Sequence, residues 1–202
     1  MNITLYTNDL SAYLAEDEII DYNDARIART AGELSQKSGS ETEYLKRAFE
    51  YVRDNIPHST SIGSNTITVS ASEVLEARHG ICFARAHLLA ALLRCRSIPA
   101  GFCYQKIILD DETAPVLVCH GLNAAYIKET DKWIRLDVGS LERFTLEDNA
   151  LVRPVRPEKG EEDGFTVYPD PDLNILAKLK KNKTRKELWD DLPTVLAYSA
   201  KK

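Results

Sequence analysis

The chain has 202 residues, of which 44% are hydrophobic and 28% are charged. This length and composition are typical of a globular protein and exclude a disordered chain, a coiled coil and a collagen. With 26 basic and 31 acidic side chains, the formal charge is −5, which argues against general nucleic-acid binding.

The first half of the chain predicts helices, each beginning at a capping residue. After a strand or loop in the first 23 residues, Asp24 is the expected N-cap of a helix that runs to about residue 34. Ser40, with a glutamate three residues later, caps a second helix, which ends at Pro57. Ser70 has the same spacing to an acid and caps a short helix that ends near residue 77.

A long buried helix and a set of strands are expected next. Gly80 gives a tight turn, and the run that follows it, Phe83–Arg96, is apolar on most faces, so we expect it in the core. From Ala100 onward the apolar period changes to two, which is typical of strands. The expected strands are Phe102–Leu109, Val116–Ile127 and Lys132–Asp137, with Gly164–Tyr168 as a short addition.

The C-terminal part is expected to contain a charged loop and a closing helix. Pro154–Asp163 is rich in proline and charge and predicts a loop, whereas Leu188–Tyr198 predicts a helix. Helices early in the chain and antiparallel strands later predict an α+β fold.

The cysteines and the N-terminus indicate a reducing compartment. The four cysteines, at positions 82, 95, 103 and 119, form no C-x-x-C pair and no regular disulfide framework. We find neither the basic nor the apolar segment of a signal peptide. The best apolar run, 84–93, is interrupted by Arg85 and His87 and is shorter than the ~18 apolar residues of a membrane span. We therefore expect a cytoplasmic protein with free thiols.

Cys82 lies directly after the glycine turn, in the first turn of the buried helix. A helix N-terminus carries about half a positive charge and unpaired N–H groups, and both stabilise a thiolate. The same N–H groups point toward the place where an oxyanion would form. Cys82 is therefore either a nucleophile or a small buried side chain that only packs.

His120 and Asp137 supply the other groups that a nucleophilic thiol needs, namely a base and an acceptor that orients the base. His120 lies within the strand Val116–Ile127, and Asp137 ends the next strand. If these strands are antiparallel neighbours, the two side chains can meet across the pair. Taken singly, His120 would be a packed core histidine and Asp137 a turn aspartate. Together with Cys82 they have the arrangement of a cysteine-nucleophile triad.

The run from Tyr44 to Asp137 resembles the core of the transglutaminase-like superfamily, which is related to papain. The matching pieces are 51–56 (YVRDNI), 71–75 (ASEVL), 80–86 (GICFARA), 91–94 (ALLR) with 98–100 (IPA), His120 in its strand and 135–137 (RLD).

This resemblance implies an α+β, papain-like or transglutaminase-core fold. The N-terminal helices would precede a nucleophile at the start of a buried helix, and that helix would pack on an antiparallel sheet. A single transglutaminase-like domain would cover 1–202. Its catalytic core would lie at about 41–145, with a helical lead at 24–35 and a C-terminal helical tail at about 172–200.

The resemblance also implies a role for each matching residue. Cys82 would be the nucleophile, His120 the general base and then the acid for the leaving amine, and Asp137 the group that orients the imidazole. The backbone N–H of Cys82 would be one oxyanion donor. The animal cross-linking members carry a tryptophan shortly before the short helix, whereas residues 66–70 here are TITVS, so the second donor is unassigned.

These roles predict a cysteine protease or amidohydrolase that hydrolyses peptide or amide bonds through a thioester on Cys82. The alternatives are a protein-glutamine transglutaminase or deamidase, and a non-catalytic peptide-binding module of the same fold. The expected partner is a peptide or protein with an amide acyl donor. We do not expect the protein to bind nucleic acid or a membrane. We expect no cofactor and no metal ion, and the sequence leaves the oligomeric state open.

Two further histidine patterns have alternative interpretations. His58 follows Pro57 at the end of a helix, and it either lines the cleft or is solvated. A zinc site could be assembled from His79 with Cys82 and from Cys119 with its neighbour, but adjacent strand residues point to opposite faces, so we do not expect one. Structural roles are expected for His87, Cys95 and Cys103.

Overall fold

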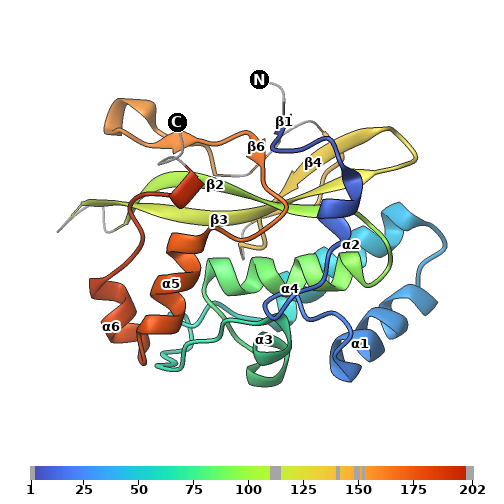
Figure 1. The fold of residues 1–202 in the computed structure, drawn as a ribbon, viewed down its shortest axis with the longest axis horizontal. Coiled ribbons are helices and arrows are strands. Elements are labelled where there is room, and N and C mark those ends of the chain that lie inside the picture. Colours follow the sequence, from blue (N-terminus) through green and yellow to red (C-terminus); the bar gives the residue numbers. More distant parts are fainter. Residues whose placement is uncertain (1–2, 110–114, 140–141, 148–150, 152, 199–202) are drawn as a thin grey trace.

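The computed structural model describes residues 3–109, 115–139, 142–147, 151 and 153–198. Four helices lie together on one side of a four-stranded sheet, and two short strands lie on the other side (Figure 1). Helices early in the chain and antiparallel strands later are the α+β arrangement that the sequence predicts. The four helices are α1 (Ala25–Gln36), α2 (Glu41–Asn55), α3 (Ala71–Ala77) and α4 (Cys82–Arg94).

The predicted caps of α1, α2 and α3 are confirmed. The Asp24 side chain accepts a hydrogen bond from the backbone N–H two residues later, and Ser40 does so from the N–H three residues later. At the start of α3, Ser70 and Glu73 form both bonds of a capping box. Each bond satisfies an N–H group that a helix start otherwise leaves unpaired.

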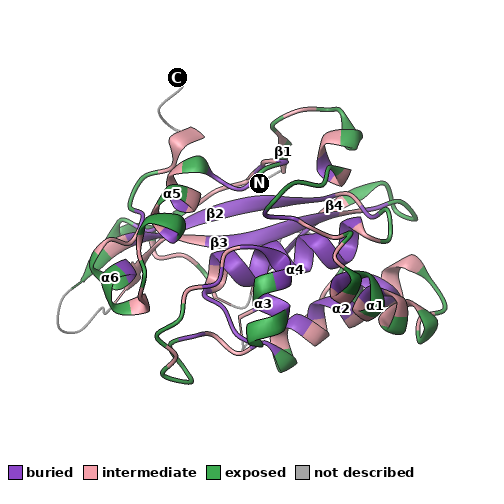
Figure 2. Cartoon of the chain, turned by 60° about the horizontal axis from the view of Figure 1, so that its bottom comes forward, coloured by how far each residue is buried: buried purple, intermediate pink, exposed green. Residues whose placement is uncertain are grey.

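Helix α4 forms the centre of the core. Every residue from Phe83 to Arg94 is buried, as the continuous purple of this helix in Figure 2 shows. Its first residue, Cys82, is partly exposed. The helix therefore meets solvent at its N-terminus. Among the described residues, no helix is long and apolar enough to cross a membrane.

Three of the four strands of the sheet that covers α4 match the prediction to within two residues at each end. β2 (Ala100–Leu109), β3 (Val116–Ile127), β4 (Lys132–Leu136) and β5 (Glu162–Asp163) form an antiparallel sheet in the order β4-β3-β2-β5. β4 pairs with residues 123–127 of β3, so the part of β3 that carries His120 extends beyond it. On the other face of the sheet, a second small core contains Tyr13, Cys103, Leu122, Ala124 and Val167.

The C-terminal part departs from the prediction. The expected helix over Leu188–Tyr198 is wrong, because residues 191–196 are not helical and the helix here is α6 (Arg185–Asp190). α6 begins at its Thr184 cap. Pro193, which has no N–H group and disfavours a helical conformation for the residue before it, prevents its continuation. A second short helix, α5 (Leu173–Lys181), precedes it.

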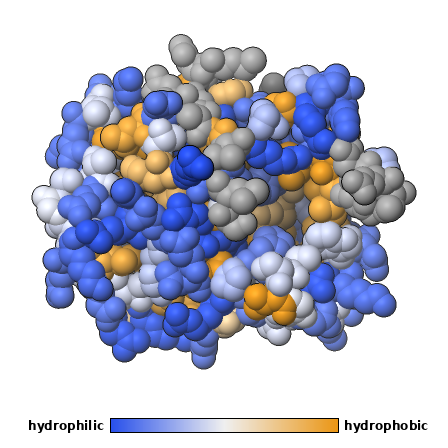
Figure 3. Space-filling view, turned by 180° about the vertical axis from the view of Figure 1, so that it is seen from behind, coloured by the Kyte–Doolittle hydropathy of each residue, from blue (hydrophilic) through white to orange (hydrophobic). Residues whose placement is uncertain are grey.

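The segment before α5 also contains more structure than predicted. The expected loop Pro154–Asp163 includes a 3-10 turn at Pro157–Lys159 as well as β5. Within the predicted strand Gly164–Tyr168, β6 (Thr166–Val167) pairs in parallel with β1 (Thr4–Leu5), and a 3-10 turn at Leu10–Leu14 follows β1. The face seen from behind the view of Figure 1 is mainly hydrophilic and carries several separate groups of hydrophobic side chains (Figure 3).

Arg94, the last residue of α4, connects distant segments of the chain. Its buried guanidinium donates to the carbonyl oxygen of Ala100 from Nε (3.0 Å) and Nη2 (2.8 Å), and to that of Ala15 from Nη1 (2.7 Å). It also donates to the carbonyl oxygen of Pro169. Burial lowers the pKa of Arg94 to about 10, so the group remains a cation at neutral pH and needs these carbonyl acceptors.

We predict that Arg94→Met lowers the free energy of unfolding by about 3 kcal/mol, because three carbonyl groups, those of Ala100 and Pro169 in buried bonds, lose their donor. The matched control is Arg96→Met, two residues later and exposed, which should change stability by less than about 0.5 kcal/mol. Urea denaturation followed by circular dichroism measures both. Equal stability of the two variants would contradict this role for Arg94.

Candidate active site

Cys82 is the first residue of α4, and the turn before it is held by close packing. A Cβ atom on Gly80 would lie 3.2 Å from Thr68 Oγ1 and 3.3 Å from atoms of Ala84 and Arg85. Gly80 does not adopt a positive φ. The close approach of α4 to this turn therefore favours glycine at position 80, whereas its backbone conformation is one that other residues also adopt. Ile81, the N-cap, forms no side-chain cap, so the N–H groups of the first turn face the site.

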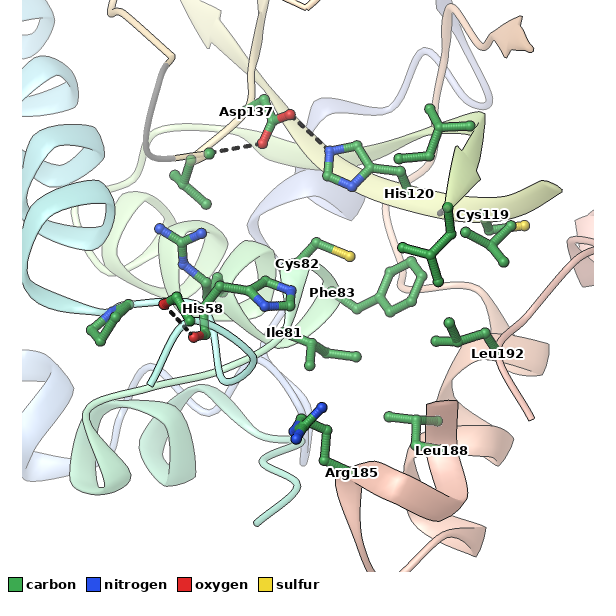
Figure 4. A pocket seen from close by; sticks show the side chains of 18 of the residues that line it. His58, Ile81, Cys82, Phe83, Cys119, His120, Asp137, Arg185, Leu188 and Leu192 are labelled. Atoms are coloured by element: carbon green, nitrogen blue, oxygen red, sulfur yellow. Dashed lines mark hydrogen bonds and ion pairs between the residues drawn. The ribbon is translucent and has the colours of Figure 1, made fainter. Parts of the chain in front are cut away.

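His120 and Asp137 meet as their strands predict. β3 and β4 are antiparallel neighbours, and His120 Nε2 lies 2.7 Å from Asp137 Oδ2. The other carboxylate oxygen of Asp137 accepts a hydrogen bond from the backbone N–H of Gly139 at 2.9 Å. Figure 4 shows the second ring nitrogen of His120, Nδ1, on the side of the ring that faces Cys82. The structure thus brings together the three residues that the sequence singles out.

The thiol of Cys82 is far more acidic than an ordinary cysteine. Burial acts to raise its pKa, but the interactions with the two neighbouring imidazoles, His120 first and then His58, outweigh burial and lower the pKa to about 6. The other three cysteines have raised pKa values because burial dominates, to about 12 for Cys103 and about 11 for Cys119. Cys82 is therefore the one thiol of the four that ionises readily at neutral pH.

The pKa values of His120 and Asp137 shift in opposite directions. Burial acts to lower the pKa of His120, but the charge of Asp137 and its hydrogen bond raise it well above the usual value. Burial acts to raise the pKa of Asp137, yet His120 and the Gly139 N–H keep it below its usual value. At neutral pH the pair formed by Cys82 and His120 is therefore a thiolate and an imidazolium, which titrate together.

Arg85 adds positive potential beneath this ion pair. Its side chain is only 4% exposed, and its charge interacts with Asp137 and Cys82. Nη2 donates weakly to the carbonyl oxygens of Val52 and Arg53, at 3.5 and 3.4 Å. Burial lowers the pKa of Arg85. The charge of Arg85 therefore influences the site from a buried position and not from the surface.

His58 lies in the site, where the sequence left its place open. It lines the same pocket as Cys82, and Figure 4 shows its ring beside the Cys82 side chain. The backbone around it pairs with Gly80, two residues before the cysteine. The sequence pointed to this place only through the position of His58 directly after Pro57. No periodicity shows that the end of one helix lies beside the start of another.

The pocket beside Cys82 has a volume of about 480 Å³ and a largely apolar wall. Five of its lining residues come from β2 and β3, and four from the region of α6. We call residues 185–193 the C-terminal wall; Figure 4 shows two of its leucines, Leu188 and Leu192, beside the pocket. The sequence does not reveal this wall, because its position depends on contacts with segments more than sixty residues away. The apolar side chains that these strands and the wall contribute are those of Ile107, Leu109, Val118, Leu188, Trp189 and Leu192.

The C-terminal wall is attached to both sides of the pocket. On the helical side, the backbone N–H of Arg185 donates to the Asn65 carbonyl (2.8 Å), and its Nε donates to the Ser64 carbonyl (2.7 Å). On the sheet side, the N–H of Cys119 donates to the Pro193 carbonyl at 2.7 Å. The bond from Cys119 lies on the part of β3 that extends beyond β4.

The remaining histidines and cysteines do not form a metal site. His79 lies between the hydroxyl groups of Ser59 and Ser64, at 3.0 Å from each. His87 is buried with Nδ1 2.7 Å from the Val69 carbonyl oxygen, as expected for a structural residue. Within the described parts of the chain, no group of three histidine, cysteine or acidic residues is placed to hold a metal ion.

Comparison with known proteins identifies the family and the fold. A family model described as the transglutaminase-like superfamily matches residues 28–138. A candidate cysteine protease from Cytophaga hutchinsonii superposes with a TM-score of 0.56 and 20% identity, over 81% of this chain and 48% of that one. The periplasmic domain of TgpA from Pseudomonas aeruginosa superposes with a TM-score of 0.46 and 18% identity, over 62% of this chain and 45% of that one.

The chain therefore spans a little under half the length of each of these two structures. No curated protein sequence matches it. At 20% identity the similarity to the Cytophaga structure concerns the fold alone. This similarity agrees with the predicted transglutaminase-core fold. The role of each site residue has to be argued from the geometry.

We predict that iodoacetamide alkylates Cys82 at least about a hundredfold faster at pH 7 than the other three cysteines, because alkylation requires the thiolate. The rate should rise with pH and be half-maximal near the Cys82 pKa of about 6. Peptide mass spectrometry after timed labelling measures each site separately.

The control is His120→Ala, which removes the imidazolium and should move the half-maximal rate of Cys82 to higher pH. Comparable labelling of all four cysteines at pH 7 in the unmodified protein would contradict an activated thiolate.

Proposed function

Because the chain belongs to the transglutaminase-like superfamily, we propose that it is a cysteine-nucleophile acyl-transfer enzyme that hydrolyses peptide or amide bonds. The observation that carries the proposal is the 2.7 Å bond between His120 Nε2 and Asp137 Oδ2. This bond turns the other ring nitrogen of His120 toward Cys82 at the start of α4 (Figure 4). A merely packed cysteine has no need of an oriented imidazole.

The first half of the reaction forms a thioester. The Cys82 thiolate attacks the amide carbonyl carbon, the S–C bond forms, and the carbonyl electron pair moves to oxygen. As this oxyanion collapses, the C–N bond breaks and the His120 imidazolium gives its proton to the leaving amine. Because the proton already lies on His120 in the resting ion pair, the nucleophile is formed before the substrate binds.

The second half releases the acyl group. Neutral His120 takes a proton from water, the resulting hydroxide attacks the thioester carbonyl, and the C–S bond breaks. The products are a carboxylic acid and the regenerated thiolate beside an imidazolium. An amine in place of water would give transamidation, so the acceptor decides between a hydrolase and a transglutaminase. Asp137 holds the His120 ring in both steps.

The pocket supports a substrate with a bulky apolar side chain near the scissile amide. A cavity of about 480 Å³ beside Cys82 accommodates a side chain such as leucine or phenylalanine. Apolar atoms of β2, β3 and the C-terminal wall would exclude water from that side chain. We therefore propose peptides or proteins as substrates. The cytoplasm remains our predicted compartment, and the free state of all four cysteines supports a reducing environment.

We predict that the protein cleaves members of a peptide library and that Cys82→Ala removes this activity together with labelling by a thiol-directed activity probe. Loss of the nucleophile should lower the rate by at least about a thousandfold. The assay compares cleavage with incorporation of a fluorescent amine. Amine incorporation without cleavage would identify a transglutaminase. Neither reaction, with an intact folded protein, would indicate a non-catalytic binding module.

We predict that Leu192→Ala lowers the preference for bulky apolar side chains by about tenfold, because the pocket loses an apolar contact. The readout is the ratio of kcat/KM for a leucine peptide to that for an alanine peptide, in which any loss of folded enzyme cancels. The matched control is Leu173→Ala, an exposed leucine at the start of α5 that does not line the pocket. An unchanged ratio in the Leu192 variant would count against this subsite.

A further inference from the structure

We propose that the His58 imidazole supplies the second donor of the oxyanion hole, beside the backbone N–H of Cys82. This inference rests on the proposed acyl-transfer function. An oxyanion hole stabilises the transition state when two donors point at the carbonyl oxygen. The first donor is the N–H of Cys82 at the uncapped start of α4. The second donor is unassigned, because residues 66–70 contain no tryptophan of the kind that the animal cross-linking members carry there.

The backbone of His58 is held in register with the turn that carries Cys82. The N–H of Gly80 donates to the Pro57 carbonyl (3.3 Å), and the N–H of Ser59 donates to the Gly80 carbonyl (3.0 Å). The Ser61 hydroxyl donates to the carbonyl of His58 itself at 2.8 Å. Hydrogen bonds on both sides of His58 therefore fix its backbone relative to the turn that carries Cys82.

The orientation of the ring follows from a second backbone contact. The N–H of Thr60 donates to His58 Nδ1 at 3.2 Å. A neutral imidazole has one donor and one acceptor nitrogen, so Nδ1 is the acceptor and the proton lies on Nε2. Since Thr60 occupies Nδ1, Nε2 is the nitrogen that remains to face the pocket shared with Cys82. The His58 ring lies beside the Cys82 side chain in Figure 4, and it thus offers an N–H group next to the nucleophile.

That position suits an oxyanion donor. In the tetrahedral intermediate the oxyanion lies two bonds from the sulfur, so a donor beside the Cys82 side chain is near the place where this oxygen forms. The two imidazoles differ in their partners. His120 is bonded to a carboxylate and carries a proton between groups, whereas His58 is bonded to a backbone N–H that favours a fixed donor.

A donor to the oxyanion must be distinguished from a group that only stabilises the thiolate. Alkylation by iodoacetamide uses the same thiolate but forms no oxyanion, whereas acylation by para-nitrophenyl hexanoate forms one. The experiment measures both rates at one pH for the unmodified protein and for His58→Ala, His58→Phe and His58→Gln. Both rates depend in the same way on the amount of thiolate and of folded protein, so the ratio of acylation to alkylation does not depend on either.

We expect this ratio to fall by about a hundredfold in His58→Ala and His58→Phe, which lack a donor. It should recover by at least about tenfold in His58→Gln, whose amide N–H₂ group is a donor. An unchanged ratio in the Ala and Phe variants would overturn the oxyanion role and leave His58 as a thiolate-stabilising group. If the unmodified protein acylates no faster than Cys82→Ala, the proposed function itself fails, and this outcome is distinct from the first.

Discussion

The burial of α4 is the constraint on which the site depends. Every residue of this helix after Cys82 is buried, so its N-terminus is the end that meets solvent, and the helix dipole points into the cleft there. The sheet, the other helices and the carbonyl acceptors of Arg94 all pack around this axis. Because so many contacts hold the helix, its first residue cannot shift easily relative to β3, and a thiol there has a constant environment.

Two histidines line the pocket beside this thiol, and their different partners give them different chemistry. His120 is bonded to Asp137, a buried carboxylate, and becomes the cation of an ion pair with Cys82. His58 receives the N–H of Thr60 and keeps its proton on the nitrogen that faces the sulfur. The same side chain therefore serves as a proton carrier at one position and as a fixed donor at the other, according to the group on the far side of the ring.

The C-terminal wall links the two sides of the cleft. It is bonded to the Ser64–Asn65 loop on the helical side and to Cys119 of β3 on the sheet side, and its apolar residues complete the pocket beside the nucleophile. A segment that bridges the helical and sheet sides restrains their separation. It also limits what can bind beside Cys82 to side chains that fit an apolar space.

The sequence by itself determined the features that depend on local chemistry. Caps at Asp24, Ser40 and Ser70 begin helices because each side chain bonds a backbone group within three residues, and period-two patterns delimit β2, β3 and β4. The order of Cys82, His120 and Asp137 followed from the same local patterns and the resemblance to one family. Only the tertiary structure decided the rest. The C-terminal wall and the place of His58 depend on contacts between distant segments, and no local periodicity encodes which surfaces meet.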